Sequence, residues 1–240
     1  MKIAAAQLSC VPADVPANVR RLVSLATAAR DEGAELVVFP ELALTGYELG
    51  ALAADPALWV TPDDPRLDPL RGLGTAVVVN GALRTGGSRP VLASLVYGPD
   101  GERLTTYAKQ HLYEQERGVF EAGDRDGRFA LGGTGFALAT CFDNHFADLT
   151  GRGAADGCRV HLASSLYGTG GGVQERATVH PGIARSTGMY VVLANHVGPA
   201  GPWTGCGGSA VWAPGGALVA EADATTATYV VAEVPVAGRD

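Results

Sequence analysis

The sequence of 240 residues predicts an α/β protein of the α+β type, in which strands outnumber helices. Short apolar runs rich in β-branched residues alternate with longer segments of helical periodicity. Turn sequences such as Gly98-Pro99-Asp100-Gly101 join some of these runs into hairpins. Because hairpins occur together with β-α-β units, we expect a mixed sheet or two packed sheets rather than a purely parallel sheet. The chain has no evident linker, so residues 1–240 are expected to form one domain.

The N-terminal elements follow from alternation and helical spacing. Ile3–Leu8, which begins with the apolar run Ile3 to Ala6, predicts a first strand. Val15–Ala29 predicts an amphipathic helix, because its apolar residues recur at spacings of three and four, and Gly33 is expected to end it. Leu36–Phe39 is wholly apolar, as expected for a short strand within a sheet that is covered on both faces.

The rest of the chain is richer in strands. They are expected at Thr75–Leu83, Pro90–Tyr97, Glu102–Tyr107, Phe136–Thr140, Arg159–Ala163, Tyr190–Asn195, Gly208–Trp212, Leu218–Ala222 and Thr228–Val234. Helices are expected at Phe146–Gly157 and Gln174–Thr187, the second of which ends at Gly188. The glycine-rich run Gly168–Gly172 is expected to form a mobile loop, because it lacks the spacing of a dinucleotide loop and does not clearly open a helix.

Composition and charge limit the partners. The formal net charge is −7 and no basic run occurs, whereas binding to a phosphate backbone requires clustered Lys and Arg. No apolar stretch approaches the roughly 18 residues of a membrane span, and the N-terminal apolar run is too short for a signal peptide. The four cysteines have no paired spacing, so we expect reduced thiols in a cytoplasmic protein without nucleic acid or membrane partners.

Several common active-site motifs are absent from the sequence. There is neither a Gly-x-x-x-x-Gly-Lys-Ser/Thr phosphate loop nor a Gly-x-Ser-x-Gly nucleophile turn. The five histidines do not have the H-x-x-x-H or H-x-H spacing of metal ligands, so no metal is expected. A metal site assembled from residues far apart in the sequence stays open at this stage.

Three functional side chains, Glu41, Lys109 and Cys141, each come shortly after the end of a predicted strand. Ligands gather at the carboxyl ends of strands in open α/β sheets, and nearby cations lower the pKa of a thiol there. Taken singly, the three residues are explained as a solvated acid, a surface lysine and an inert core cysteine. Together they indicate a catalytic site.

An ordered set of sequence blocks extends from Gln7 to about Val219. The blocks are Phe39-Pro40-Glu41-Leu42, Thr45-Gly46-Tyr47, Tyr107-Ala108-Lys109-Gln110-His111-Leu112-Tyr113, Cys141-Phe142-Asp143, Ala194-Asn195-His196-Val197-Gly198, Gly207-Gly208-Ser209-Ala210-Val211 and Pro214-Gly215-Gly216. In this order they resemble the nitrilase superfamily of carbon–nitrogen hydrolases. The resemblance implies a four-layer α-β-β-α sandwich of two mixed sheets flanked by helices. It also implies a homodimer or a higher homo-oligomer.

The resemblance places the family's catalytic Glu-Lys-Cys on Glu41, Lys109 and Cys141. Glu41 would take the thiol proton, and the thiolate would attack an amide, carbamoyl or nitrile carbon. Lys109 and the backbone N–H of Phe142 would stabilise the oxyanion, and water would hydrolyse the resulting thioester. This chemistry requires neither a metal nor an organic cofactor.

The family has a second glutamate after the lysine, and Glu116 matches its spacing best. Glu114 and Glu121 are close competitors for the same role. The residue in this position would orient Lys109 and balance the charge of the pocket.

The segment after the nucleophile departs from the commonest family pattern. Many members have an apolar residue, Arg, Phe, Pro and Glu after Cys-aromatic-Asp, where this chain has Asn144-His145-Phe146-Ala147-Asp148. The missing arginine and proline leave the substrate and the role of Asn144 unassigned. Tyr47, Phe142, His145 and Tyr167 are the expected substrate contacts, although a histidine satisfied within the fold explains His145 equally well.

We therefore expect a cysteine-dependent hydrolase of non-peptide C–N bonds, in particular an amidase or carbamoylase that acts on a small linear amide. The alternatives are nitrile hydrolysis or acyl transfer to an amine at the same site, and a non-catalytic binding protein on the same fold. The presence of Glu41, Lys109 and Cys141 together argues against a binding protein. The sequence does not indicate which acyl group or leaving amine is accepted.

Overall fold

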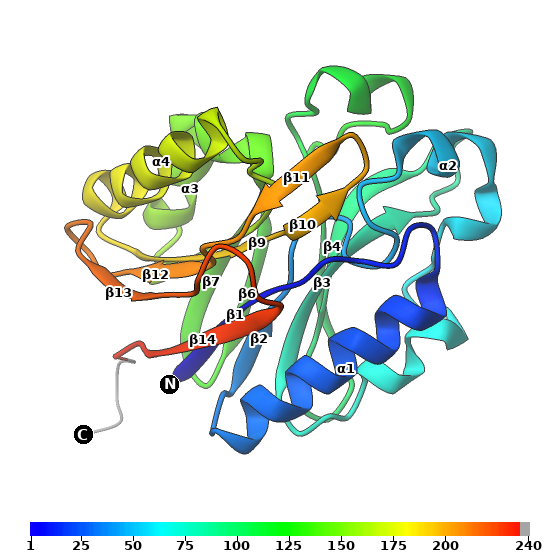
Figure 1. The fold of residues 1–240 in the computed structure, drawn as a ribbon. Coiled ribbons are helices and arrows are strands. Elements are labelled where there is room, and N and C mark those ends of the chain that lie inside the picture. The colour runs from blue at the N-terminus through cyan, green and yellow to red at the C-terminus, as the bar shows by residue number, and fades with distance from the viewer. Residues whose placement is uncertain (236–240) are drawn as a thin grey trace.

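Two six-stranded sheets lie face to face in the computed structural model, which describes residues 1–235 (Figure 1). In spatial order, the first sheet consists of β14 (Thr228–Glu233), β1 (Lys2–Gln7), β2 (Leu36–Val38), β3 (Ala76–Leu83), β4 (Val91–Tyr97) and β5 (Arg103–Ala108). The second consists of β13 (Leu218–Glu221), β12 (Ala210–Trp212), β9 (Tyr190–Asn195), β8 (Val160–Ser165), β7 (Thr134–Thr140) and β6 (Gly127–Leu131). Each sheet is parallel at its centre and antiparallel at its edges.

Helices cover the outer face of each sheet. Helix α1 (Val15–Asp31) packs on the first sheet, and α3 (Ala147–Ala155) and α4 (Gly171–Thr187) pack on the second (Figure 1). The remaining helical segments are α2 (Leu49–Ala54) and the 3-10 turns η1 (Pro56–Leu58), η2 (Pro65–Leu70), η3 (Glu114–Gly118) and η4 (Cys141–His145). The layers therefore follow the order α-β-β-α, which confirms the fold class predicted from the sequence.

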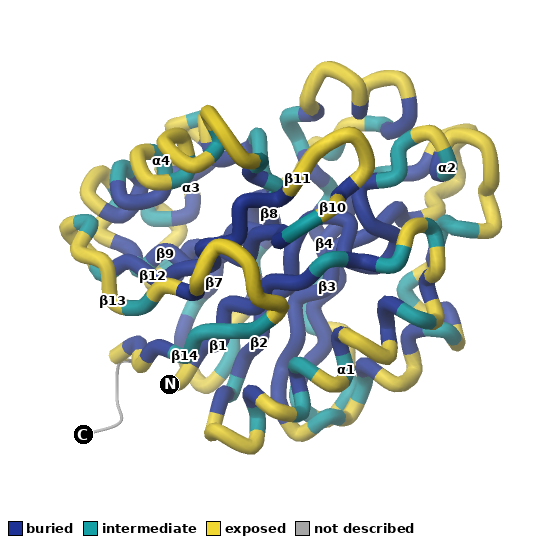
Figure 2. The backbone as a smooth tube through the Cα atoms, in the orientation of Figure 1, coloured by how far each residue is buried: buried dark blue, intermediate teal, exposed yellow. Residues whose placement is uncertain are grey.

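Strand alternation divides the apolar residues between three layers of core. In β1, Ile3 faces the second sheet whereas Ala4 faces α1. In β8, Leu162 faces the first sheet whereas Ala163 faces α4. Successive side chains of a strand point to opposite faces, so central strands with both faces covered are apolar throughout. Figure 2 shows these strands as a continuous buried region, with exposed residues concentrated on the helices and loops.

Local signals set the ends of α1. The carboxylate of Asp14 accepts a hydrogen bond from the N–H of Ala17 at 2.9 Å, which satisfies one of the unpaired donors of the first turn. Gly33 follows the helix with a φ of +89°, in the left-handed region that glycine adopts without strain. The predicted start at Val15 and the predicted stop at Gly33 are both confirmed.

The predicted strands agree with the observed strands to within two residues at each end. The hairpin of β10 (Val197–Ala200) and β11 (Trp203–Cys206) was not predicted, because Gly and Pro interrupt its sequence and weaken the strand pattern. Strand β6 and the short helices between residues 49 and 70 were also not predicted. The single domain expected over residues 1–240 stays a prediction, and its last five residues, 236–240, lie outside the described residues.

The prediction of a mobile loop over Gly168–Gly172 is wrong in its second half. Gly171 and Gly172 form the first turn of α4, and Gly170 precedes that turn with a φ of +81°. The first half of the run is attached to β11, because the Thr169 N–H donates to the Thr204 carbonyl oxygen at 2.8 Å. Glycine is a weak helix former, so its density in this run concealed the start of the helix.

The strand directions bring several chain segments to one edge of the sandwich. Strands β2 and β5 run in the same direction, since β5 is separated from the parallel pair β2–β3 by two antiparallel pairings. Strands β7 and β8 are parallel neighbours in the second sheet. The segments that follow all four strands meet at the same edge and line one cavity. Among the described residues, no helix has the length and apolarity needed to cross a membrane.

We expect the Leu162→Ala substitution to lower the free energy of unfolding by about 3 kcal/mol, because it leaves a cavity between the two sheets. Leu218→Ala is the control, since Leu218 is about half exposed on β13, and its effect should stay within about 0.5 kcal/mol. Urea unfolding followed by circular dichroism measures both values. Equal losses for the two variants would contradict the assignment of the core.

Candidate active site

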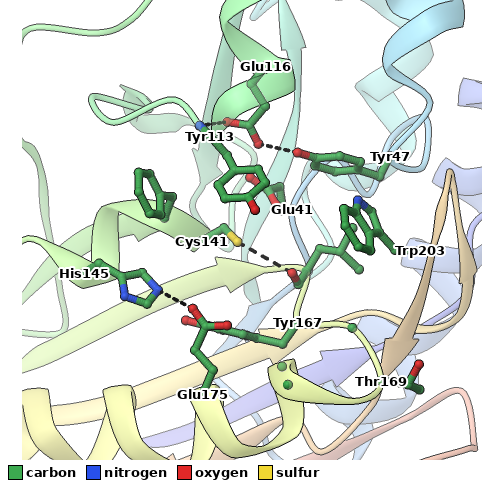
Figure 3. A pocket seen from close by; sticks show the side chains of 15 residues that line it. Glu41, Tyr47, Tyr113, Glu116, Cys141, His145, Tyr167, Thr169, Glu175 and Trp203 are labelled. Atoms are coloured by element: carbon green, nitrogen blue, oxygen red, sulfur yellow. Dashed lines mark hydrogen bonds and ion pairs between the residues drawn. The ribbon is translucent and has the colours of Figure 1, made fainter.

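A cavity of about 340 Å³ opens at the edge of the sandwich where the four strand ends meet (Figure 3). Its walls come from the segments after these strands, from the start of α4 and from the β10–β11 hairpin. The lining residues are Glu41, Tyr47, Tyr113, Glu116, Cys141, Phe142, His145, Leu166, Tyr167, Gly168, Thr169, Gly171, Gly172, Glu175 and Trp203. Most of the site residues predicted from the sequence therefore line this cavity.

Glu41, Lys109 and Glu116 form a cluster of charges beside the Cys141 end of the cavity. The Nζ atom of Lys109 lies 2.7 Å from Oε1 of Glu41 and 2.8 Å from Oε2 of Glu116. All three side chains are almost completely buried. Buried charges are tolerated only when they are paired and hydrogen-bonded, so both carboxylates depend on the single lysine.

Two further hydrogen bonds orient Glu116. The Tyr47 hydroxyl donates to its Oε1 at 2.7 Å, and the Tyr113 N–H donates to its Oε2 at 2.8 Å. Glu114 is exposed on η3 and Glu121 is half-buried, and neither lines the cavity. Of the three glutamates considered from the sequence, Glu116 is the one that the fold brings to the lysine.

Cys141 sits where β7 turns into η4, and its φ of +44° is unusual for a residue other than glycine. Its Sγ lies 3.7 Å from the carbonyl oxygen of Leu166 and points into the cavity (Figure 3). The Asn144 side chain donates to the Cys141 carbonyl at 2.8 Å and accepts from Nε2 of His161 at 2.7 Å. Asn144, whose role the sequence left open, thus holds the strained turn that presents the thiol.

The Asp143 carboxylate also holds the nucleophile turn in place through hydrogen bonds. Its Oδ2 accepts hydrogen bonds from the Tyr107 hydroxyl at 2.7 Å and from the Thr140 N–H at 3.0 Å. Its Oδ1 accepts from the His111 N–H at 2.8 Å. The carboxylate therefore connects the end of β5 in the first sheet to the nucleophile turn in the second sheet.

The backbone around Glu41 is held by two buried polar side chains. Leu42 has a φ of +49°, and its N–H donates to Oδ1 of Asn80 at 2.6 Å. The His196 ring donates to the carbonyl oxygen of Glu41, and burial lowers the pKa of this histidine to about 4, so it is neutral. Sequence reasoning missed Asn80, although an amide within the apolar run of β3 is itself a signal of a buried polar contact.

Burial dominates the electrostatics of the site. It raises the pKa of Glu41 to about 8, against the opposing charge of Lys109. Burial and the charge of Glu41 together raise the pKa of the Cys141 thiol well above its ordinary value. Lys109 lowers this pKa, as expected from the sequence for a nearby cation, but desolvation outweighs the lysine and the net shift is upward. For Lys109, burial alone would lower the pKa, but the two carboxylates raise it, so the amine stays charged.

The four expected substrate contacts all line the cavity, and each has a distinct environment there. The Tyr47 hydroxyl is engaged by Glu116, whereas the buried Tyr167 hydroxyl has no hydrogen bond partner within residues 1–235. Phe142 is the residue after the nucleophile, and its ring packs edge-on against Tyr113. His145 contacts a residue that the sequence did not indicate, Glu175, whose Oε1 lies 2.9 Å from Nε2 of the ring.

The sequence also missed Thr169 and Trp203, which reach the cavity from the glycine-rich run and from β11. In the part of the chain that the structure describes, no group of three or more His, Cys, Asp or Glu residues is arranged to hold a metal ion. The functional groups that reach the cavity are a thiol, carboxylates, hydroxyls, the imidazole of His145 and other aromatic rings.

Comparison with known proteins identifies the family of the chain. The sequence model of the carbon-nitrogen hydrolase family matches residues 2–239. The chain belongs to the carbon-nitrogen hydrolase family. It is 30% identical over 239 residues to an (R)-stereoselective amidase from Pseudomonas sp., covering 96% of this chain and 84% of the amidase. It is 27% identical over 246 residues to a nitrilase from Pyrococcus abyssi, covering 98% of this chain and 89% of the nitrilase.

Among solved structures, this carbon-nitrogen hydrolase resembles an amidase of the nitrilase superfamily from Nesterenkonia sp. AN1. The TM-score is 0.90 at 27% sequence identity, over 98% of this chain and 90% of the amidase chain. The resemblance predicted from the ordered sequence blocks is thus confirmed, as is the prediction that the protein is an enzyme acting on carbon–nitrogen bonds.

We expect Lys109→Met to lower the free energy of unfolding of this carbon-nitrogen hydrolase by about 3 to 5 kcal/mol at a pH above the Glu41 pKa of about 8, because two buried carboxylates then lose their cation. The loss should shrink as the pH falls, since unpaired carboxylates have raised pKa values and their protonation favours the folded state. Denaturant unfolding at several pH values measures this. Lys2→Met, at an exposed lysine, is the matched control.

Proposed function

We propose that the protein is an amidase that hydrolyses a small linear amide through a thioester on Cys141. One observation carries this proposal: the thiol opens onto a small cavity, with the Glu41–Lys109–Glu116 cluster packed beside it. A thiol with a raised pKa is a poor nucleophile by itself and requires an adjacent base. The geometry offers Glu41 for that role.

The two oxygens of Glu41 have separate environments. Oε1 accepts the hydrogen bond from Lys109, whereas Oε2 is buried and has no hydrogen bond partner within residues 1–235. Oε2 is therefore the atom with a lone pair available for the thiol proton. Contact with the Cys141 thiol, together with Lys109, opposes the effect of burial on the pKa of Glu41.

In the first step, Oε2 of Glu41 takes the proton of Cys141 while Sγ attacks the amide carbonyl carbon. The carbonyl π electrons move onto its oxygen, which Nζ of Lys109 and the N–H of Phe142 stabilise by hydrogen bonds. Phe142 is the second residue of η4, where the first N–H groups have no partner within the helix. One such donor is worth roughly 3 kcal/mol in the transition state.

In the second step, Glu41 returns the proton to the amide nitrogen, the C–N bond breaks and ammonia or an amine leaves. The resulting thioester is attacked by water, with Glu41 again acting as the base. Collapse of that intermediate breaks the C–S bond, releases the carboxylic acid and restores the Cys141 thiol. Glu116 takes part in neither proton transfer, but keeps Lys109 charged and oriented.

The relatives support an amide as the substrate. Structures of the Nesterenkonia amidase are described in complex with butyramide and with the acetamide moiety of fluoroacetamide added covalently at the active-site cysteine. Extended to this chain, these complexes support a small linear amide and covalent chemistry at Cys141. The homo-oligomer and the cytoplasmic location expected from the sequence stay predictions.

Cys141→Ala is expected to lower amidase activity by at least about 10³-fold, because the acyl group then has no nucleophile. Ammonia release from a panel of short amides, carbamoyl compounds and nitriles measures the activity, and intact mass detects the thioester. Cys158→Ala is the matched control, because Cys158 lies between α3 and β8 and does not line the cavity. Full activity of Cys141→Ala would refute the mechanism.

The pH dependence of kcat/KM should report Glu41. The carboxyl must be deprotonated to accept the thiol proton, and burial raises its pKa to about 8. We therefore expect kcat/KM for butyramide to increase as the pH rises through about 8, and to fall tenfold per unit below that value. Initial rates between about pH 5.5 and 9 test this. A flat profile over that range would contradict the role of Glu41 as base.

A further inference from the structure

Glu175 and His145 lie within hydrogen-bonding distance of each other at the cavity wall, away from the catalytic cluster (Figure 3). Glu175 extends from α4, and His145 is the last residue of η4, four residues after the nucleophile. Within the described residues, the structure gives the Glu175 carboxylate one hydrogen-bonding partner, Nε2 of this ring at 2.9 Å. The Glu175 side chain is 47% exposed, so the carboxylate remains accessible to a ligand in the cavity.

Three carboxylates line the cavity, those of Glu41, Glu116 and Glu175, and the imidazole of His145 is the one basic side chain that lines it among residues 1–235. Of residues 1–235, no arginine or lysine lines it. Lys109, the proposed donor to the oxyanion, has a fully buried side chain and is already shared by Glu41 and Glu116. A substrate that carries its own carboxylate would therefore meet Glu175 without a free cation to pair with, which disfavours its binding.

Aromatic rings provide much of the remaining wall. Tyr113, Phe142 and Trp203 all line the cavity, and Tyr113 and Trp203 are exposed to 37% and 44%. Aromatic faces attract organic cations, and a carboxylate beside them adds a charged hydrogen bond acceptor. This combination is suited to an ammonium or guanidinium group.

We infer that Glu175 is a specificity-determining residue that selects amides carrying a positive charge at the end remote from the scissile carbonyl. This inference deepens the proposed function and rests on it, because it assigns the substrate class of the same cavity. His145 positions the carboxylate by holding one of its oxygens. The cavity of about 340 Å³ is at the small end of the usual range of roughly 300 to 1,000 Å³, so the favoured substrate is a short aminoalkyl amide.

Three amides of matched length test the inference. 4-Aminobutanamide carries an ammonium group, pentanamide replaces that group with a methyl, and the monoamide of glutaric acid places a carboxylate there. For the wild-type enzyme, kcat/KM should decrease in this order, with the cationic amide preferred over the neutral one by roughly tenfold or more. Equal rates for 4-aminobutanamide and pentanamide, or a preference for the anionic amide, would overturn the inference.

Two variants test whether Glu175 is the source of the preference for the cationic amide. Glu175→Gln should reduce the ratio of kcat/KM between 4-aminobutanamide and pentanamide towards one, and Glu175→Lys should make the glutaric monoamide the better of the two charged substrates. Glu114→Gln removes the same charge from an exposed site on η3 outside the cavity, so its ratio should equal that of the wild type. An unchanged ratio in a folded Glu175→Gln variant would also overturn the inference.

Binding to the Cys141→Ala variant separates the inference from the proposed function. Calorimetry of this variant with the three amides measures charge selectivity without turnover. Tighter binding of 4-aminobutanamide, together with no ammonia and no thioester adduct from the wild type, would refute the amidase mechanism but retain the selectivity. Hydrolysis of all three amides without charge preference in binding or turnover would refute the selectivity alone.

Discussion

A single buried lysine between two buried carboxylates is the constraint on which the site depends. Glu41 follows a central strand, Lys109 follows the edge strand of the same sheet, and Glu116 comes from a short helical turn. None of these charges is tolerated in the interior without the others, so the three segments must meet at one point. The two-sheet architecture satisfies this requirement by directing the relevant strand ends to a common edge. The nucleophile turn is then connected to that edge through Asp143.

The sequence predicted much of this arrangement because the relevant signals are local. Alternation and apolar runs located the predicted strands, and a strand end marks each of Glu41, Lys109 and Cys141. The start of α4 was misplaced because glycine is a poor helix former, although Gly171 and Gly172 complete the first turn beside the cavity. The β10–β11 hairpin was missed because Gly and Pro interrupt its strand pattern.

Other features of the site depend on distances in space and were beyond sequence reasoning. Glu175 lies in a polar part of α4, where the sequence alone does not distinguish it from a surface residue. Its place in the site follows from folding, because η4 brings His145 next to it. The net rise of the Cys141 thiol pKa was not predicted, since a motif reveals which charges are near but not how completely water is excluded. The sequence did not indicate a role for Asn144, because its hydrogen bonds to the Cys141 carbonyl and to His161 form only in the folded chain.

The protonated state of Cys141 has a consequence for the chemical durability of the enzyme. Peroxides and alkylating agents react with thiolates, and a cysteine that ionises freely is gradually lost to sulfenic and higher oxidation states. Here the proton leaves sulfur only when Glu41 accepts it, so a resting molecule presents a comparatively inert thiol to such reagents. Desolvation thus keeps the thiolate fraction of the resting nucleophile low, which slows these side reactions between turnovers.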